Sequence, residues 1–291
     1  MQRAMMVIGS ACIVLAAGMV QGGQITVAGS STVKPVVDKA AAQYKESHSE
    51  TSFAIGGGGS SKGVKLAGEG KVMLGMASRD MKAKEKEAYP DVVPTKVGLD
   101  GIAIVTNKKN PVQTITKQQV ADIYVGKITN WKDLGGNDAP IVLTAMGTSH
   151  GTHSMFLKYF GLEAENPGGD KKTIVHKVKG ADAWADATAR SVESSKEGMS
   201  AVMTNPNAIG YVSIGPAAAV AEKGAPIKLL ELDGVVATTD NVANGSYPLC
   251  RSLYVLTKGQ PAGEVAEFIE YLLGTDGQAI VAEHGYIPAK K

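Results

Sequence analysis

The segment ITVAGSST, residues 25–32, is the part of the chain that decides the fold. A short apolar run leads into Gly29 and three hydroxyl residues, and the apolar side chains that follow recur at helical spacing as far as Tyr44. A strand that ends in small hydroxyl residues at a helix start directs backbone N–H groups, hydroxyls and the positive end of a helix dipole towards one point. The segment therefore predicts an α/β unit that can hold an oxyanion through Ser30, Ser31 and Thr32.

Composition narrows the classes of protein to consider. The chain has 291 residues, of which 44% are hydrophobic, and it is long enough for two domains with substantial cores. Its net charge of +2 gives no electrostatic reason to expect nucleic acid or an anionic membrane as a partner. An aromatic content of 5% argues against a surface on which bases or sugars stack. We expect a globular protein with a small-molecule ligand.

Residues 1–22 have the pattern of a secretory signal peptide. Arg3 precedes an apolar run over residues 5–17, and Gly18 and Gly22 follow as candidate cleavage positions. The run is too short to span a bilayer, so an uncleaved anchor helix is the less favoured alternative. Cleavage predicts a periplasmic protein.

The two cysteines agree with export. Cys12 lies in the signal segment, and lipidation there is disfavoured because Gly9 stands where an aliphatic residue is needed. Cleavage leaves Cys250 alone, and a single cysteine forms no internal disulfide.

Apolar runs alternate with helix-patterned segments along the rest of the chain. Predicted strands cover residues 25–28, 51–55, 72–77, 92–97, 101–106, 141–146, 208–212 and 253–257. Predicted helices cover residues 34–46, 63–68, 82–88, 117–124, 154–160, 181–190 and 262–273. This alternation predicts mainly parallel sheets with helices on both faces. We expect two lobes, with residues 23–105 and 250–291 in lobe 1 and residues 106–249 in lobe 2, joined by two crossings.

Three further loops share the character of the first. They are Gly56–59 with Ser60 and Ser61, then Ser78-Arg79-Asp80, and, at a helix start in the other lobe, Ser149, His150, Gly151 and Thr152. Ligands on such sheets sit at the carboxyl ends of strands, where these loops fall. A buried oxyanion needs many donors, and Arg79 can add a charge-assisted pair. The loops together predict an oxyanion site.

Simpler interpretations of these residues stay open. A Gly/Ser loop before a helix is most often a turn and an N-cap, and Arg79 with Asp80 is often a surface ion pair. His150 and His153 are three residues apart, but two histidines make a poor metal site, so we expect both to be solvated. The chain lacks the Gly-x-Ser-x-Gly, His-Glu-x-x-His and Walker patterns, so we expect no enzyme, no catalytic residue, no metal and no cofactor.

Several motifs resemble those of the substrate-binding proteins of bacterial phosphate ABC transporters. The matching pieces, in the family's order, are GSSTV at 29–33, GGGSS at 57–61, ASRD at 77–80, DGIAIVTN at 100–107, IYxGKI at 123–128 with NW at 130–131, AIGYV at 208–212 and YPLCR at 247–251. They span nearly the whole mature chain and are specific as a set.

The resemblance implies a type II periplasmic-binding-protein fold whose two lobes close on dehydrated inorganic phosphate or a similar oxyanion. Position by position it implies ligands at Ser30, Ser31 and Thr32, at Ser60 and Ser61, and at Gly151 and Thr152 from the opposite lobe, with Arg79 as the charged clamp. Asp100 is the candidate acceptor for a protonated phosphate oxygen, which would favour phosphate over sulfate. The implied partner is an ABC permease; we expect a monomer that binds no nucleic acid.

The fourth loop departs from the family's pattern. An arginine usually lies four residues before Ser-Gly-Thr, but here that position is Met146, the serine is His150 and the arginine that often follows is His153. Losing a charged donor predicts binding weaker by about tenfold to a hundredfold, unless a protonated His150 or His153 compensates below about pH 6.5. The alternative is the same fold with a detuned or different ligand, in a sensor or envelope interaction protein. A secreted phosphatase is a remoter possibility.

Overall fold

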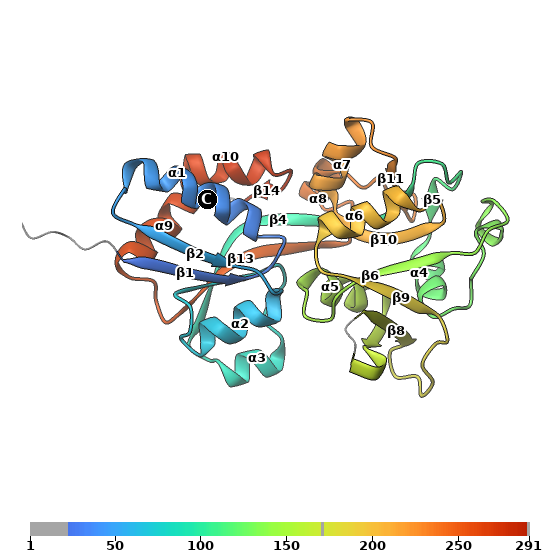
Figure 1. Ribbon diagram of the computed structural model, residues 1–291, viewed down its shortest axis with the longest axis horizontal. Coiled ribbons are helices and arrows are strands. Elements are labelled where there is room, and N and C mark those ends of the chain that lie inside the picture. Colours follow the sequence, from blue (N-terminus) through green and yellow to red (C-terminus); the bar gives the residue numbers. More distant parts are fainter. Residues whose placement is uncertain (1–22, 170–171, 290–291) are drawn as a thin grey trace, which may run out of the picture.

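The computed structural model describes residues 23–169 and 172–289, and the predicted signal segment lies outside them. The chain forms two α/β lobes with helices on both faces of the sheet in each (Figure 1), as predicted. One sheet runs through both lobes in the strand order β2-β1-β3-β13-β4-β10-β6-β9-β8-β7, and β11 and β14 also pair with β4.

Lobe 1 is built around a core to which Ile25, Tyr44, Met76 and Phe268 belong. Its elements are β1 (Gln24–Gly29), α1 (Lys34–Ser47), β2 (Ser52–Gly56), α2 (Ser60–Gly68), β3 (Leu74–Ala77), α3 (Ala83–Ala88), the first part of β4 (Val92–Asn107), β13 (Cys250–Lys258), α9 (Gly263–Leu273), α10 (Thr275–Glu283) and β14 (Ile287–Pro288). Strand β1 pairs in parallel with β2 and β3, so the loops after these strands emerge at one edge of the sheet.

Lobe 2 has a larger core that includes Tyr124, Trp131, Phe156 and Tyr211. Its elements are β5 (Thr114–Ile115), α4 (Lys117–Tyr124), short 3-10 helices at Trp131–Leu134 and Pro167–Gly169, β6 (Val142–Met146), α5 (Gly151–Phe160), β7 (Leu162–Glu165), β8 (Thr173–Val178), β9 (Thr188–Val192), α6 (Ser195–Thr204), β10 (Ala208–Ser213), α7 (Ile214–Glu222), β11 (Ile227–Leu229), β12 (Glu231–Leu232) and α8 (Thr239–Ala243). Strand β6 pairs in parallel with β9 and β10, which brings the loop before α5 to the side facing lobe 1.

Strands β4 and β13 connect the lobes. The sequence predicts two strands where β4 is one, because glycines at 98 and 101 interrupt the apolar pattern. The strand continues because β13 pairs with it as far as Gly101 and β10 pairs with it from Ile102 onwards. The predicted boundaries between the two lobes fall inside β4 and at the start of β13, and they stay predictions.

The predicted helix over residues 181–190 is wrong. This segment is irregular until β9 begins at Thr188, where pairing with β6 and β8 overrides the helix propensity of its alanines. Helices α6, α7, α8 and α10 were not predicted. An N-cap residue marks the start of α6, because the Ser194 side chain accepts a hydrogen bond from the backbone N–H of Glu197.

Candidate functional site

The three loops of lobe 1 are joined to one another by short hydrogen bonds. The N–H of Gly59, before α2, donates to the Gly29 carbonyl at 2.9 Å. The N–H of Ser78, after β3, donates to Ser60 Oγ at 3.0 Å. Ser30 Oγ accepts from the N–H of Thr32 at 3.2 Å. The predicted loops therefore form one continuous edge rather than separate turns.

The loop before α5 meets this edge from lobe 2. The N–H of Ser61 donates to the Ser149 carbonyl at 3.2 Å. A Cβ placed on Gly151 would lie 2.5 Å from Ser60 Oγ and 2.6 Å from Ser78 Oγ, so only glycine permits this approach. The structure thus brings the four predicted loops together between the lobes.

Arg251 on β13 lies where these loops meet. Its Nη1 donates to Ser78 Oγ at 3.2 Å and to Thr152 Oγ1 at 2.5 Å. Its Nη2 donates to Thr32 Oγ1 at 3.1 Å. None of its side chain is exposed. One buried guanidinium therefore connects loops of both lobes.

Asp100 on β4 neutralises this charge. Its Oδ2 accepts from Arg251 Nε and Nη2 at 3.0 and 2.8 Å, and from Ser213 Oγ at 2.9 Å. Burial raises the pKa of Asp100, although the charge and hydrogen bonds of Arg251 and the hydroxyl of Ser213 oppose the shift. Its Oδ1 is buried and has no partner among the described residues. A protonated ligand oxygen can donate to such an acceptor.

Sequence reasoning missed Arg251 as a site residue, although it lies in one of the family motifs. The signal was local: Arg251, Leu253 and Val255 alternate on the buried face of an apolar strand. A charged residue at an inward-facing position requires a buried partner.

Arg79, the predicted clamp, is held by a carboxylate. Its Nη2 and Nη1 donate to Glu85 at 2.6 and 2.7 Å, and its Nη2 also reaches Ser61 Oγ at 3.1 Å. Burial raises the pKa of Glu85, but the hydrogen bonds from Arg79 and from the N–H of Lys82 outweigh it and keep that pKa below its ordinary value. Arg79 remains a predicted ligand, at the edge of the site.

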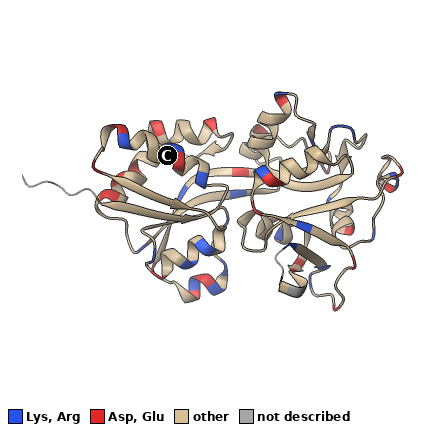
Figure 2. Ribbon diagram, in the orientation of Figure 1, with Lys and Arg blue, Asp and Glu red and all other residues tan. Residues whose placement is uncertain are grey.

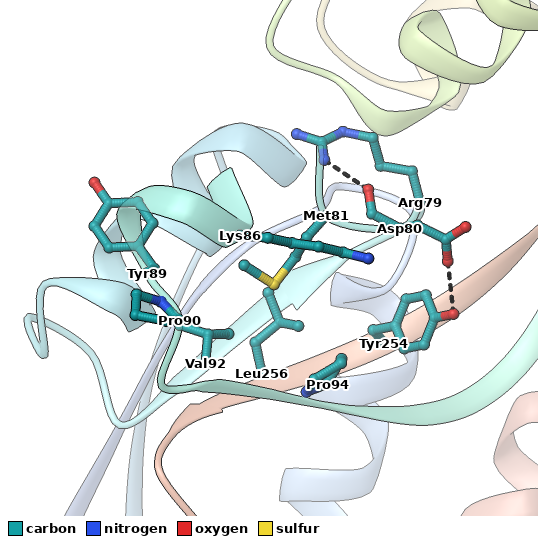
Figure 3. A pocket seen from close by; sticks show the side chains of 10 residues that line it. All are labelled: Arg79, Asp80, Met81, Lys86, Tyr89, Pro90, Val92, Pro94, Tyr254 and Leu256. Carbon is teal, nitrogen blue, oxygen red and sulfur yellow. Dashed lines mark hydrogen bonds between the residues drawn. The ribbon is translucent and has the colours of Figure 1, made fainter. Parts of the chain in front are cut away.

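The pocket beside Arg79 is a separate feature. Figure 3 shows Arg79 bonded to the Asp80 carbonyl and the Asp80 carboxylate bonded to Tyr254. The pocket, of about 330 Å³, is lined by apolar side chains such as Met81 and Leu256 together with the charged residues Arg79, Asp80 and Lys86. It contains none of the hydroxyl residues of the four loops, so we do not assign the oxyanion to it.

His150 and His153 are both buried, contrary to the expectation that they are solvated. His150 lies with Nδ1 3.2 Å from Ser31 Oγ and Nε2 3.0 Å from Glu193 Oε2. His153 points into lobe 2, with Nδ1 2.6 Å from Tyr211 Oη. Burial, followed by the proximity of His176, lowers the pKa of His153 to about 3. Protonated His153 therefore cannot replace the missing arginine.

Met146 completes this account of the fourth loop. Its side chain belongs to the core of lobe 2, and its backbone N–H donates to Tyr211 Oη at 3.1 Å.

Within residues 23–169 and 172–289, no group of three or more His, Cys, Asp or Glu side chains could hold a metal ion. None of the helices in the same ranges is long and apolar enough to cross a membrane.

The charges outside the site are mixed. Figure 2 shows basic and acidic residues interspersed on the helices of both lobes. This agrees with the net charge of +2.

Comparison with known proteins shows consistent similarities. Residues 17–276 match the model of the PBP superfamily domain. The phosphate-binding protein PstS of Bacillus subtilis is 32% identical over 269 residues, which cover 91% of this chain and 81% of that protein. A crystal structure from Clostridium perfringens with bound phosphate, assigned as a phosphate ABC transporter substrate-binding protein, is 35% identical. The two structures superpose with a TM-score of 0.78, and the alignment covers 92% of this chain and 100% of that one. An ABC-type phosphate transport receptor from Vibrio cholerae is 30% identical, with a TM-score of 0.71 and coverage of 92% and 100%.

Proposed function

The chain belongs to the PBP superfamily and, within it, to the PstS family of phosphate-binding proteins, and we propose that it captures inorganic phosphate between its lobes and delivers it to an ABC permease. The observation that carries the proposal is the position of Arg251, whose guanidinium reaches Thr32 and Ser78 of lobe 1 and Thr152 of lobe 2. A single cation surrounded by hydroxyls from both lobes suits an oxyanion that binds as the lobes close.

The donors around Arg251 can replace the hydration of a bound anion. Hydroxyls of the predicted ligands supply hydrogen bonds without bulk, and backbone N–H groups at the start of α5 add to them. The free Oδ1 of Asp100 can accept from the proton of hydrogen phosphate. Sulfate carries no such proton at neutral pH and would place two lone pairs against each other, so we propose Asp100 as the residue that discriminates between them.

The proposal is a binding role in the periplasm, without catalysis. The relatives are transport binding proteins, and closure of the lobes is the change a permease would recognise. The division into lobes at residues 105/106 and 249/250 belongs to this proposal, because phosphate would bind where those crossings meet.

Isothermal titration tests the proposal. We expect phosphate to bind at about pH 7 and sulfate to bind at least about a hundredfold more weakly. The variant Thr152→Val keeps the side-chain shape and should weaken phosphate binding, whereas Asp100→Asn should narrow the gap between phosphate and sulfate. Absence of binding heat with any tetrahedral oxyanion between about pH 5 and 8 would refute the proposal.

One observation favours a second candidate, a detuned or different oxyanion receptor that acts as a sensor or envelope interaction protein. Arg251 is already neutralised by Asp100, Arg79 is paired with Glu85, and the position of the family's other arginine is Met146. The site therefore offers an anion little net positive charge. Submicromolar affinity for phosphate would exclude this alternative.

A further inference from the structure

His150 links Ser31 of lobe 1 to Glu193 of lobe 2 through its two ring nitrogens. It precedes α5 of lobe 2, yet its Nδ1 lies 3.2 Å from Ser31 Oγ in the first loop of lobe 1. Its Nε2 lies 3.0 Å from Glu193 Oε2 in the segment between β9 and α6. The imidazole is 3% exposed and the Glu193 side chain 66% exposed. This row of three side chains runs from solvent to a predicted ligand of the oxyanion.

The hydrogen-bond chemistry of this row has only two consistent arrangements. An ionised carboxylate only accepts, so the Nε2 of His150 must carry a hydrogen. In the neutral imidazole Nδ1 is then bare and accepts the single hydrogen of the Ser31 hydroxyl, which leaves lone pairs facing an anion. In the imidazolium both nitrogens donate, Ser31 Oγ accepts, and its hydrogen is free to point at the ligand.

Building on the proposed function, we infer that Glu193 is a positioning residue that, through His150, sets the direction of the Ser31 hydroxyl and thereby the strength of oxyanion binding. Glu193 stabilises the imidazolium, and the imidazolium turns Ser31 into a donor. Acidification favours the imidazolium of a histidine, so it favours the arrangement in which the Ser31 hydroxyl donates to the ligand.

Position and access support this role. The backbone N–H of Glu193 donates to Glu197 Oε2 at 2.9 Å, which holds it at the start of α6. Glu193 also lines a pocket of about 290 Å³ that is bordered by Gly58 of lobe 1 and Ser149 of lobe 2. Protons can therefore reach His150 from the rim of the gap between the lobes.

The other buried histidines of lobe 2, His153 and His176, are neutral in the folded protein at the pH values of interest, because burial lowers their pKa values to about 3 and about 4. His153, on the first turn of α5, interacts electrostatically with His176, with His150 and with Lys82 in the segment before α3. The ring nitrogens of His150 face Ser31 and Glu193.

Phosphate titrations of the wild type and the variant Glu193→Gln, from about pH 5.5 to 8, test the inference. Glutamine can still accept from Nε2–H but does not stabilise the imidazolium. We expect the variant to bind about tenfold more weakly than the wild type at the acid end and equally well at the alkaline end. Comparing the two proteins at each pH cancels the titration of phosphate itself.

Three controls separate this role from a structural one. Glu163→Gln removes a carboxylate of lobe 2 that pairs with Lys177 at 3.4 Å, and it should leave the wild-type profile unchanged. Glu193→Asp keeps the charge and should keep the acid-side tightening. Ser31→Ala should abolish the effect of Glu193→Gln, because no hydroxyl remains to be turned.

Two results would overturn the inference while leaving the proposed function intact. One is an identical pH profile for the wild type and Glu193→Gln. The other is an NMR spectrum that shows the hydrogen of neutral His150 on Nδ1 rather than Nε2. A wild type that binds no phosphate at any pH would instead refute the proposed function.

Discussion

Replacing Arg251 by methionine should both destabilise the protein and abolish phosphate binding. The substitution removes six hydrogen bonds, to Asp100, Ser78, Thr152, Thr32 and Ser213. It leaves Asp100, 1% exposed, without its cation. Breaking a buried ion pair by removing one partner costs about 3–5 kcal/mol of unfolding free energy. Methionine fills much of the volume, so this cost comes mainly from the isolated charge.

The loss should depend on pH in a defined direction. Burial already raises the pKa of Asp100, and loss of Arg251 removes the main opposing charge. A carboxyl group whose folded-state pKa is raised contributes stability at low pH, and that contribution is lost as the pH rises through its pKa. The deficit of Arg251→Met relative to the wild type should therefore be largest near neutral pH and shrink as the pH falls towards the raised pKa.

Urea unfolding followed by circular dichroism measures the deficit, and titration calorimetry measures binding. The double variant Arg251→Met/Asp100→Leu should recover most of the stability but still bind phosphate at least about a hundredfold more weakly than the wild type. As a control, Lys34→Met breaks the exposed pair with Asp38 and should change the unfolding free energy by less than about 0.5 kcal/mol. Wild-type stability and wild-type phosphate affinity in Arg251→Met would refute the reasoning.

Two further predictions concern the approach of the lobes and the core of lobe 2. In Gly151→Ala the added methyl would meet Ser60 Oγ and Ser78 Oγ, so phosphate affinity measured by calorimetry should fall at least about tenfold. Gly57→Ala, with no atom within 4 Å of the new Cβ, should bind normally. Burial lowers the pKa of His153 to about 3 and that of His176 to about 4, so both rings are neutral in the folded protein. Stability from a lowered histidine pKa is present above about pH 6.5 and is lost on acidification, by about 2 kcal/mol per ring at pH 5. The variant His176→Phe should therefore lose less stability than the wild type when the pH is lowered, as measured by urea unfolding.

Each of these predictions has a clear contrary outcome. Equal phosphate affinity for Gly151→Ala and the wild type would mean that the lobes do not approach at this glycine during binding. Urea midpoints that fall equally steeply with pH in His176→Phe and the wild type would mean that His176 is not held neutral in the folded state.

Local sequence was sufficient to predict the strand–loop–helix units. Apolar spacing after Thr32 placed α1, and the hydroxyl and glycine residues before α2 and α5 marked the loops that meet between the lobes. Such signals succeed because strand ends, helix starts and tight turns depend on neighbouring residues. The same reasoning failed at residues 181–190, where pairing with β6 and β8 outweighs local propensity.

The sequence by itself determined which hydroxyls, amides and glycines stand at the edge of the sheet, because those choices are made within a few residues. The tertiary structure decided which charged side chains lie beside these groups. Arg251 forms hydrogen bonds with Thr152, Asp100 and Thr32, which precede it in the sequence by 99, 151 and 219 residues. Arg79 forms an ion pair with Glu85. The partner of a long charged side chain depends on which groups lie near it in space and on the cost of burying its charge. Both are set only when the two lobes are packed, so local sequence does not reveal them.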